Sequence, residues 1–274
     1  MRKLYEKSQW VVIGKVVPPA ASPGFTAPTN VNVSLEVLSI VKGTLRAKSL
    51  PICSPSDHEC HAPVKYQVGK TVLIFLNEAP DKTGFYPEAE SYGVKVLAEK
   101  DQALYVRRLQ ELSAIQNDSN PKQEQARQTV EWLVECVENP VTTWEGVSEL
   151  AHPQDFIASF GKPPLELLRS AQKDRLAKIL YDSRSVSSLD LDLLKVVQKL
   201  DDPRVNGFLR HLLEQSDSAT LQGITISYRL ARRVQSNEAR QLIINFWKTP
   251  IEDQRKRENV RKLIEQVLLA TKAK

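Results

Sequence analysis

The first third of the chain shows alternating apolar and polar positions, a pattern typical of β-strands. Between residues 31 and 37 apolar side chains alternate with polar ones, as expected for a strand with one buried face. Residues 71–76 are almost continuously apolar, which predicts a strand buried on both faces. More short strands are predicted between loops that carry glycine or proline, at residues 9–17, 49–53, 85–86 and 92–97. Together these strands predict a closed or nearly closed antiparallel barrel over residues 1–116.

The period of the hydrophobic pattern becomes helical near residue 100. Ala103, Val106, Leu109 and Leu112 recur at helical spacing, so one helix is predicted to cap the barrel. The polar segment 116–121 then ends in a proline, and we expect a domain boundary there.

Residues 121–274 are predicted to form an all-α domain. Apolar positions at helical spacing predict helices over residues 125–138, 165–181, 189–200, 205–213, 218–233, 238–247 and 251–270. The prolines between these helices, Pro140, Pro203 and Pro250, are unevenly spaced, so a helix bundle and a solenoid of helix pairs both stay open. The predicted fold class is therefore α+β, with two domains: a barrel followed by a helical array.

Composition and charge exclude few functions. Hydrophobic residues make up 41% and charged residues 26% of the chain, which is ordinary for a folded protein. The net charge is +5, with 14 Lys and Arg against 11 Asp and Glu in residues 1–117, and 24 against 22 in the rest. We interpret these charges as a solvated surface. No apolar run reaches the ~18–20 residues of a membrane span, and no signal-peptide core follows the basic start at Met1.

The barrel region resembles a known family of modules. Three consecutive segments carry the resemblance: residues 8–16, residues 35–44 with their Lys-Gly-Thr turn, and residues 68–76 with their initial Val-Gly-Lys. In this order they resemble the OB-fold domain of tissue-inhibitor-of-metalloproteinase-like (TIMP-like) and netrin-module proteins in secreted bacterial chains. The resemblance covers residues 8–115 at most. It implies a periplasmic or secreted protein, whereas the missing leader argues the other way.

The inhibitory chemistry of that family is not expected here. In the animal inhibitors an amino-terminal cysteine chelates the zinc of the protease. Residues 1–10 contain no cysteine. A protease-inhibitor-like module that lacks this cysteine therefore stays only as a second alternative function.

The helical half resembles HEAT-type repeats at one place. The segment 193–205, followed by residues 208–213, places an Asp-Pro-x-Val break at Asp202-Pro203 between two apolar helices. The resemblance implies an extended scaffold that binds proteins, and it names no ligand.

One loop of the barrel region gathers cysteine and histidine. A disulfide between Cys53 and Cys60 would close a small loop and would suit an exported domain. Free thiols are an alternative, and a zinc site of Cys53, His58, Cys60 and His61 is another. The spacing matches no common zinc pattern, and the adjacent Cys60 and His61 fit one ion poorly. Cys136 lies between apolar residues of a predicted helix and is interpreted as a buried core thiol.

Catalytic motifs are missing from the sequence. It contains no Gly-x-Ser-x-Gly elbow, no phosphate-binding glycine loop and no His-Glu-x-x-His. We therefore predict neither an enzyme nor a cofactor. Single-stranded nucleic acid is an alternative ligand, because OB-like barrels stack bases on aromatic side chains between basic ones. The residues available for that are Trp10, Tyr66, Phe75, Phe85, Tyr86, Tyr92, Lys15, Lys65, Lys70 and Lys95.

The favoured function is non-enzymatic protein binding or scaffolding, for a partner that the sequence does not name. Trp132 and Trp144 bracket the turn at Pro140. An exposed tryptophan there would be a binding anchor, whereas a packed one would hold the turn between two helices. Trp144, with Arg232 and Arg233 of the basic C-terminal helices, forms the predicted contact set.

Overall fold

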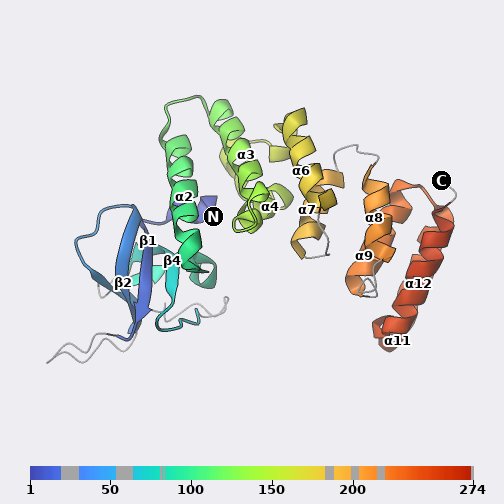
Figure 1. Ribbon diagram of the computed structural model, residues 1–274, viewed down its shortest axis with the longest axis horizontal. Coiled ribbons are helices and arrows are strands. Elements are labelled where there is room, and N and C mark those ends of the chain that lie inside the picture. The colour runs from blue at the N-terminus through green and yellow to red at the C-terminus, as the bar shows by residue number, and fades with distance from the viewer. Residues whose placement is uncertain are drawn as a thin grey trace. The chain divides into compact units, whose positions relative to one another are not determined.

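The chain folds as an α+β protein (Figure 1). The computed structural model describes residues 1–19, 31–53, 64–80, 82, 84–182, 188–198, 204–214 and 220–272. Two compact units are present: Met1–Glu149 with Pro153–Leu167, and Leu150–His152 with Leu168–Lys274. Each unit has its own set of buried apolar residues.

The first unit is built around a closed five-stranded barrel. The strands are β1 (Trp10–Val17), β2 (Val31–Lys42), β3 (Ser49–Cys53), β4 (Thr71–Glu78), β5 (Phe85–Pro87) and β6 (Val94–Leu97). They pair in the order β1-β2-β3-β5-β4, and the β1–β4 pairing closes the barrel, while β6 continues along β4. This arrangement confirms a barrel and is compatible with an OB-like fold. The antiparallel prediction was wrong at one place, because β3 and β5 are parallel where Ile52 meets Phe85.

Strand β4 is the centre of the barrel, as its continuous apolar run predicted. It pairs with β1 on one side, and with β6 and then β5 on the other. Its residues from Val72 to Leu76 are all buried. The inner face of β4 contributes Val72, Ile74 and Leu76 to the barrel core. Leu73 and Phe75 lie on the opposite face of the strand, on the side of α1 and α4.

Among the described residues, the first unit also contains α1 (Arg2–Lys7), α2 (Gln102–Asn117), α3 (Lys122–Glu138), α5 (Gln154–Phe160) and the part of α4 (Thr143–Ala151) up to Glu149. The helices predicted after residue 100 and over residues 125–138 are confirmed as α2 and α3. Helices α1, α4 and α5 were not predicted. Short 3-10 turns cover Glu90–Gly93, Glu99–Asp101 and Pro164–Glu166.

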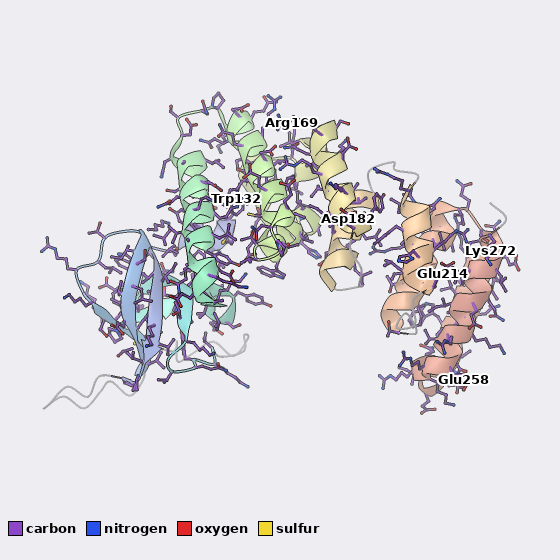
Figure 2. The ribbon with its side chains drawn as sticks, viewed as in Figure 1. Trp132, Arg169, Asp182, Glu214, Glu258 and Lys272 are labelled. Atoms are coloured by element: carbon purple, nitrogen blue, oxygen red, sulfur yellow. The ribbon has the colours of Figure 1, made fainter. Side chains whose placement is uncertain are left out.

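The predicted boundary at residues 116–121 is the turn between α2 and α3, which pack together. Trp132 on α3 donates its indole N–H to the carbonyl of Arg108 on α2, 2.9 Å away (Figure 2). The Arg108 guanidinium in turn pairs with Glu135 on α3. Helix α3 therefore belongs to the same compact unit as the barrel, and a domain division at this turn stays a prediction.

The second unit is helical. Its helices are α6 (Ser170–Asp182), α7 (Ser188–Gln198), α8 (Arg204–Glu214), α9 (Leu221–Arg233), α10 (Asn237–Trp247), α11 (Ile251–Arg255) and α12 (Arg257–Ala270). Helix α9 packs on α8, α10 and α12, and α6 packs on α7. Thr220 and Ser236 cap α9 and α10 by accepting backbone N–H bonds. Within the described ranges, no helix is both long enough and apolar enough to cross a bilayer.

Two predicted helices differ from the structure. The helix predicted over residues 251–270 is broken into α11 and α12, because Lys256 has an extended backbone conformation with φ −69° and ψ 118°. The helix predicted to start at Leu165 begins at Ser170 instead. There the Gln172 side chain accepts the backbone N–H of Arg169 at 2.7 Å, and the prolines at 163 and 164 confine the preceding residues to a 3-10 turn.

Cys136 should resist alkylation while the protein is folded. Its side chain is buried on α3, as predicted, and burial raises the pKa of the thiol to about 12. Because the thiolate is the reactive form, the folded protein should label only through opening of α3. Peptide-level mass spectrometry after brief iodoacetamide treatment, with and without guanidinium, measures this. Equal labelling rates in the two conditions would contradict the burial.

Candidate binding groove

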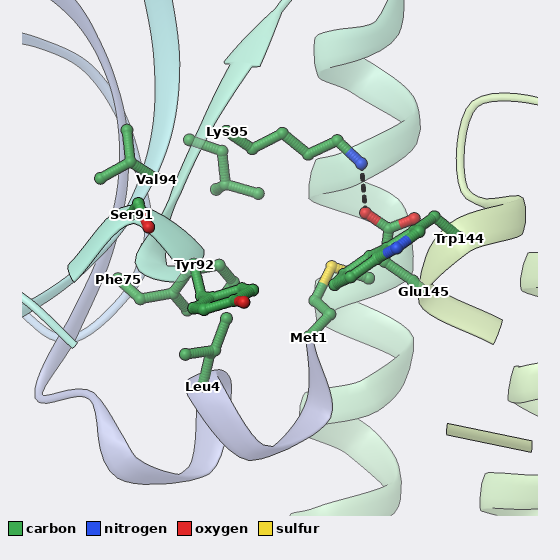
Figure 3. A pocket seen from close by; sticks show the side chains of 10 residues that line it. Met1, Leu4, Phe75, Ser91, Tyr92, Val94, Lys95, Trp144 and Glu145 are labelled. Carbon is green, nitrogen blue, oxygen red and sulfur yellow. Dashed lines mark hydrogen bonds and ion pairs between the residues drawn. The ribbon is translucent and has the colours of Figure 1, made fainter. Parts of the chain in front are cut away.

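The first unit contains a groove of about 230 Å³ between the barrel and its helices (Figure 3). Helix α1 contributes Met1 and Leu4 to one side of it. The barrel contributes the apolar floor, which includes Phe75 on β4 and Val94 on β6. Figure 3 shows the Tyr92 ring at the barrel side, with Trp144 from α4 facing it and Glu145 directed toward Lys95.

Arg2 holds α1 against the helices of this unit. Its Nε donates to Glu149 Oε1 at 2.6 Å, and its Nη1 donates to Ser159 Oγ at 3.0 Å. The guanidinium carbon also lies 5.9 Å and 5.5 Å from the ring centroids of Phe156 and Phe160. These contacts are charge-assisted hydrogen bonds and cation–π contacts, and they position the groove side that α1 provides.

Lys42 holds the other end of α1. Its ammonium group donates to the carbonyl oxygens of Tyr5 and Ser8, the latter at 2.6 Å. A cation at this end of a helix is favourable because the last carbonyls carry partial negative charge. Burial lowers the pKa of Lys42 from its ordinary value. Helix α1 is thus fixed to the barrel and to α4 and α5 together.

A buried polar cluster closes one end of the groove. Glu145 Oε1 accepts a hydrogen bond from Lys95 and another from the Tyr105 hydroxyl at 3.0 Å. The Lys95 ammonium also lies over the Tyr105 ring, 4.7 Å from its centroid. Burial, and next the neighbouring Glu145 charge, raise the pKa of Tyr105, so its hydroxyl keeps its proton. The cluster joins β6, α2 and α4 at one point.

Gly146 lets α4 approach α3 closely. A Cβ atom there would lie 2.9 Å from the backbone nitrogen of Val137, and closer still to the carbonyl oxygen of Leu133. Trp144 and Glu145 precede this glycine, so the close approach also sets where their side chains enter the groove.

The two tryptophans beside Pro140 have different roles. Trp132 is buried and holds the α2–α3 packing, whereas Trp144 is 46% exposed and lines the groove. Tyr92, across the groove, is 65% exposed. Two aromatic side chains therefore stand at the rim, above an apolar floor.

Comparisons with protein-family models, curated proteins and solved structures find no match to this chain. The function is therefore inferred from the residues of the groove. Those residues come from four separate stretches of the sequence, which is why no local motif revealed them. The sequence did nominate Trp144 for binding, and it nominated Tyr92 and Lys95 only for the nucleic-acid alternative.

Arg232 and Arg233 lie in the second unit, on α9, whereas Trp144 lies in the first. The Arg232 guanidinium lies 5.9 Å from the ring centroid of Tyr228 on the same helix. Arg233 Nε donates to Asn206 Oδ1 of α8 at 2.9 Å. Arg233 thus helps to hold α8 and α9 together, whereas Arg232 is exposed.

The cysteine and histidine loop falls mostly outside the described residues. Cys53 is buried at the end of β3, but His58, Cys60 and His61 are not described. The disulfide and the zinc site both stay predictions. Elsewhere in the described chain, no three His, Cys, Asp or Glu side chains come together to hold a metal ion.

Most barrel aromatics nominated for base stacking serve the fold instead. The rings of Trp10 and Phe85 meet edge to face at 5.4 Å, and the Trp10 indole N–H donates to the Thr44 carbonyl at 3.2 Å. Tyr66 packs against the barrel core, and Phe75 is buried. These four rings therefore contribute to the packing of the barrel unit.

Proposed function

We propose that this chain is a non-enzymatic protein-binding module that takes an apolar side chain of its partner into the groove between Tyr92 and Trp144. The exposed aromatic pair above an apolar floor is the observation that carries the proposal. Tryptophan and tyrosine are the side chains most often found at the energetic centre of protein interfaces. They offer a large apolar area together with a polar group, at little cost in side-chain entropy.

The groove is suited to binding because its walls are held in place before a partner arrives. Arg2 and Lys42 fix α1, and the Lys95–Glu145–Tyr105 cluster fixes α4 against the barrel. A preformed site loses less conformational entropy on association than a flexible one. The binding free energy can then come from burial of the apolar side chain.

Lys95 gives the groove a polar preference. Its side chain remains about one-third exposed, although it pairs with Glu145. An ammonium group has three N–H donors, so some are left for an acceptor on the partner. The preferred segment would place a carboxylate or a backbone carbonyl beside its apolar anchor.

We also propose a fold type for the barrel and for the helical second unit. The strand order supports an OB-like barrel of the TIMP-like and netrin-module type. The consecutive packing of α6 on α7 and of α8 on α9 supports a HEAT-like scaffold in the second unit. The nucleic-acid alternative has less support, because a stacking surface needs exposed rings and most of the nominated barrel aromatics are buried or packed against the barrel core.

Peptides selected from a displayed random library on the full chain should depend on Trp144 and Tyr92. Trp144→Ala and Tyr92→Ala should each weaken such a peptide by about tenfold or more, the usual effect of removing a central aromatic anchor. Fluorescence polarisation with the synthetic peptide measures the dissociation constants. Ile157→Ala is the matched control, because Ile157 is an exposed apolar residue of the same unit outside the groove.

Two results would contradict the proposal. In the first, selected peptides bind the Trp144→Ala and Tyr92→Ala variants as tightly as the unmodified chain. In the second, the chain selects no peptides but binds single-stranded nucleic acid with an affinity that falls steeply as salt is added. That second result would favour the barrel as a nucleic-acid site.

A further inference from the structure

The positive charge of the chain is concentrated in its last helices. Residues 229–274 contain 12 Lys and Arg against 5 Asp and Glu, a net charge of +7, whereas the whole chain carries +5. The charge count for residues 118–274 as a whole does not show this concentration, because acidic residues in the middle of the chain offset the basic C-terminal part. The net positive charge is therefore concentrated in the part of the chain that forms α9 to α12.

Exposed apolar side chains stand within this basic region, where α10 ends and α11 begins. Trp247 is 50% exposed and Ile251 is 60% exposed, and Ile244 lies exposed one turn before Trp247. The turn between the helices is held by Gln254, whose Nε2 donates to the carbonyls of Trp247 at 3.1 Å and Thr249 at 2.7 Å. The apolar residues are thus presented by an ordered turn.

Cations of the same turn have few internal partners. Lys256 pairs with Asp253 at 2.6 Å. Within the described part of the chain, Lys248 and Arg255 form no ion pair, and both are exposed. Among the described residues, Lys256 therefore has an ion-pair partner and Arg255 has none. We call Ile244, Trp247, Lys248, Ile251 and Arg255 the α10–α11 corner.

Acidic residues near the corner reduce its charge without cancelling it. Between residues 244 and 262 there are six cations against three acids: Lys248, Arg255, Lys256, Arg257, Arg261 and Lys262 against Glu252, Asp253 and Glu258. The first turn of α12, which contains Glu258, lies next to α11 (Figure 2). The corner thus combines exposed apolar groups with a net positive charge.

We propose that the α10–α11 corner binds the surface of a membrane that contains anionic phospholipids. Trp247 and Ile251 enter the headgroup region, while Lys248 and Arg255 pair with lipid phosphates. Tryptophan favours the membrane interface, and each nearby cation adds attraction to an anionic surface. A peripheral membrane contact needs both insertion of apolar side chains and electrostatic attraction to anionic lipids, and the corner supplies both.

The exposed aliphatic side chains favour a membrane surface over nucleic acid as the partner of the corner. Cations and Trp247 could also serve an RNA strand, since bases stack on aromatic rings. The exposed Ile244 and Ile251 would stay in water on such a partner, because an aliphatic group neither stacks on a base nor bonds a phosphate. A lipid interface buries them.

Vesicle flotation with the full chain tests the proposal. The chain should float with vesicles of phosphatidylcholine mixed with phosphatidylglycerol, and should stay in solution with phosphatidylcholine alone. Replacing Trp247 and Ile251 together by alanine should weaken the partitioning by about tenfold or more. Reversing both corner charges, Lys248→Glu with Arg255→Glu, should weaken it by a similar factor.

A matched charge control is available in the same unit. Lys178→Glu with Lys272→Glu changes the net charge equally at exposed positions on α6 and after α12, and it should leave partitioning within about twofold of the unmodified chain. Circular dichroism confirms that each variant is folded. The proposal is overturned if anionic vesicles do not bind the chain, or if this control loses as much binding as the corner variants. Equal dependence of RNA binding on Trp247 and Ile251 would also overturn it, because the corner would then serve polyanions in general.

Discussion

Gly146→Ala should lower the free energy of unfolding of the first unit by about 3 kcal/mol. The new methyl group would lie too close to the carbonyl oxygen of Leu133 and only 2.9 Å from the backbone nitrogen of Val137. Backbone atoms of a helix cannot rotate away as a side chain can, so α4 must move from α3. Guanidinium unfolding followed by tryptophan fluorescence measures the loss, because three of the four tryptophans, Trp10, Trp132 and Trp144, lie in this unit.

The same substitution at Gly207 is the control. Gly207 lies inside α8, and an added Cβ there meets nothing within 4 Å. Alanine stabilises a helix interior relative to glycine by about 0.5–1 kcal/mol, so Gly207→Ala should stabilise the second unit. The two substitutions are expected to change the free energy of unfolding in opposite directions. A neutral Gly146→Ala variant would show that α3 and α4 can separate without loss of packing.

Lys95→Met should destabilise the first unit by about 2 kcal/mol. It removes a charged partner from the buried Glu145 carboxylate, whose other oxygen has no hydrogen-bond partner among the described residues. Removing one member of a buried ion pair commonly costs about 3–5 kcal/mol, and the value is smaller here because Lys95 is partly exposed. Denaturant unfolding measures the change, and Lys95→Arg, which keeps the charge, should recover most of it.

A double-mutant cycle tests whether the pair explains this loss. Glu145→Leu should cost less than Lys95→Met, because the freed Lys95 ammonium can reach water and the Tyr105 hydroxyl keeps the Val141 carbonyl, 2.9 Å away, as an acceptor. In the double variant the two losses should not add, with a coupling of about 1 kcal/mol or more. If the stability losses of Lys95→Met and Glu145→Leu simply add, the loss in Lys95→Met comes from the packing of the Lys95 side chain and not from its pair with Glu145.

The two variants also affect the groove. Gly146→Ala moves the helix that carries Trp144, and Lys95→Met loosens that helix from β6. Both should weaken a selected peptide in addition to any effect on stability. The groove therefore depends on contacts behind its surface as well as on the aromatic rings at its rim.

Prediction from sequence worked best where a pattern is local. The alternation around residues 31–37 and the apolar run of 71–76 correspond to β2 and β4. The short helices α1, α4 and α5 were missed because six to nine residues carry too few repeats of a 3.6-residue period. No pattern in the sequence indicated that Arg2 is buried against Glu149, because the two residues lie far apart in the chain.

The binding groove was only partly predictable. Trp144 could be nominated because it follows a proline turn, but its exposure was left open beside that of Trp132. The partnership of Lys95 with Glu145 joins residues fifty positions apart, and no spacing rule links them. Arg232 and Arg233 were grouped with Trp144 because they belong to the basic C-terminal helices, and they lie in the other compact unit.

The sequence by itself determined that a β-rich first part precedes a helical second part, that β4 is a central strand, and that Cys136 lies in a helix core. These features follow from hydrophobic periodicity, which each segment carries within a few residues. Only the tertiary structure decided that α3 packs with the barrel unit, that one tryptophan of the pair is buried and the other exposed, and that Tyr92, Lys95 and Trp144 line one groove. Those outcomes depend on contacts between distant segments, whose free energies come from burial and pairing in the folded chain and leave no periodic trace in the sequence.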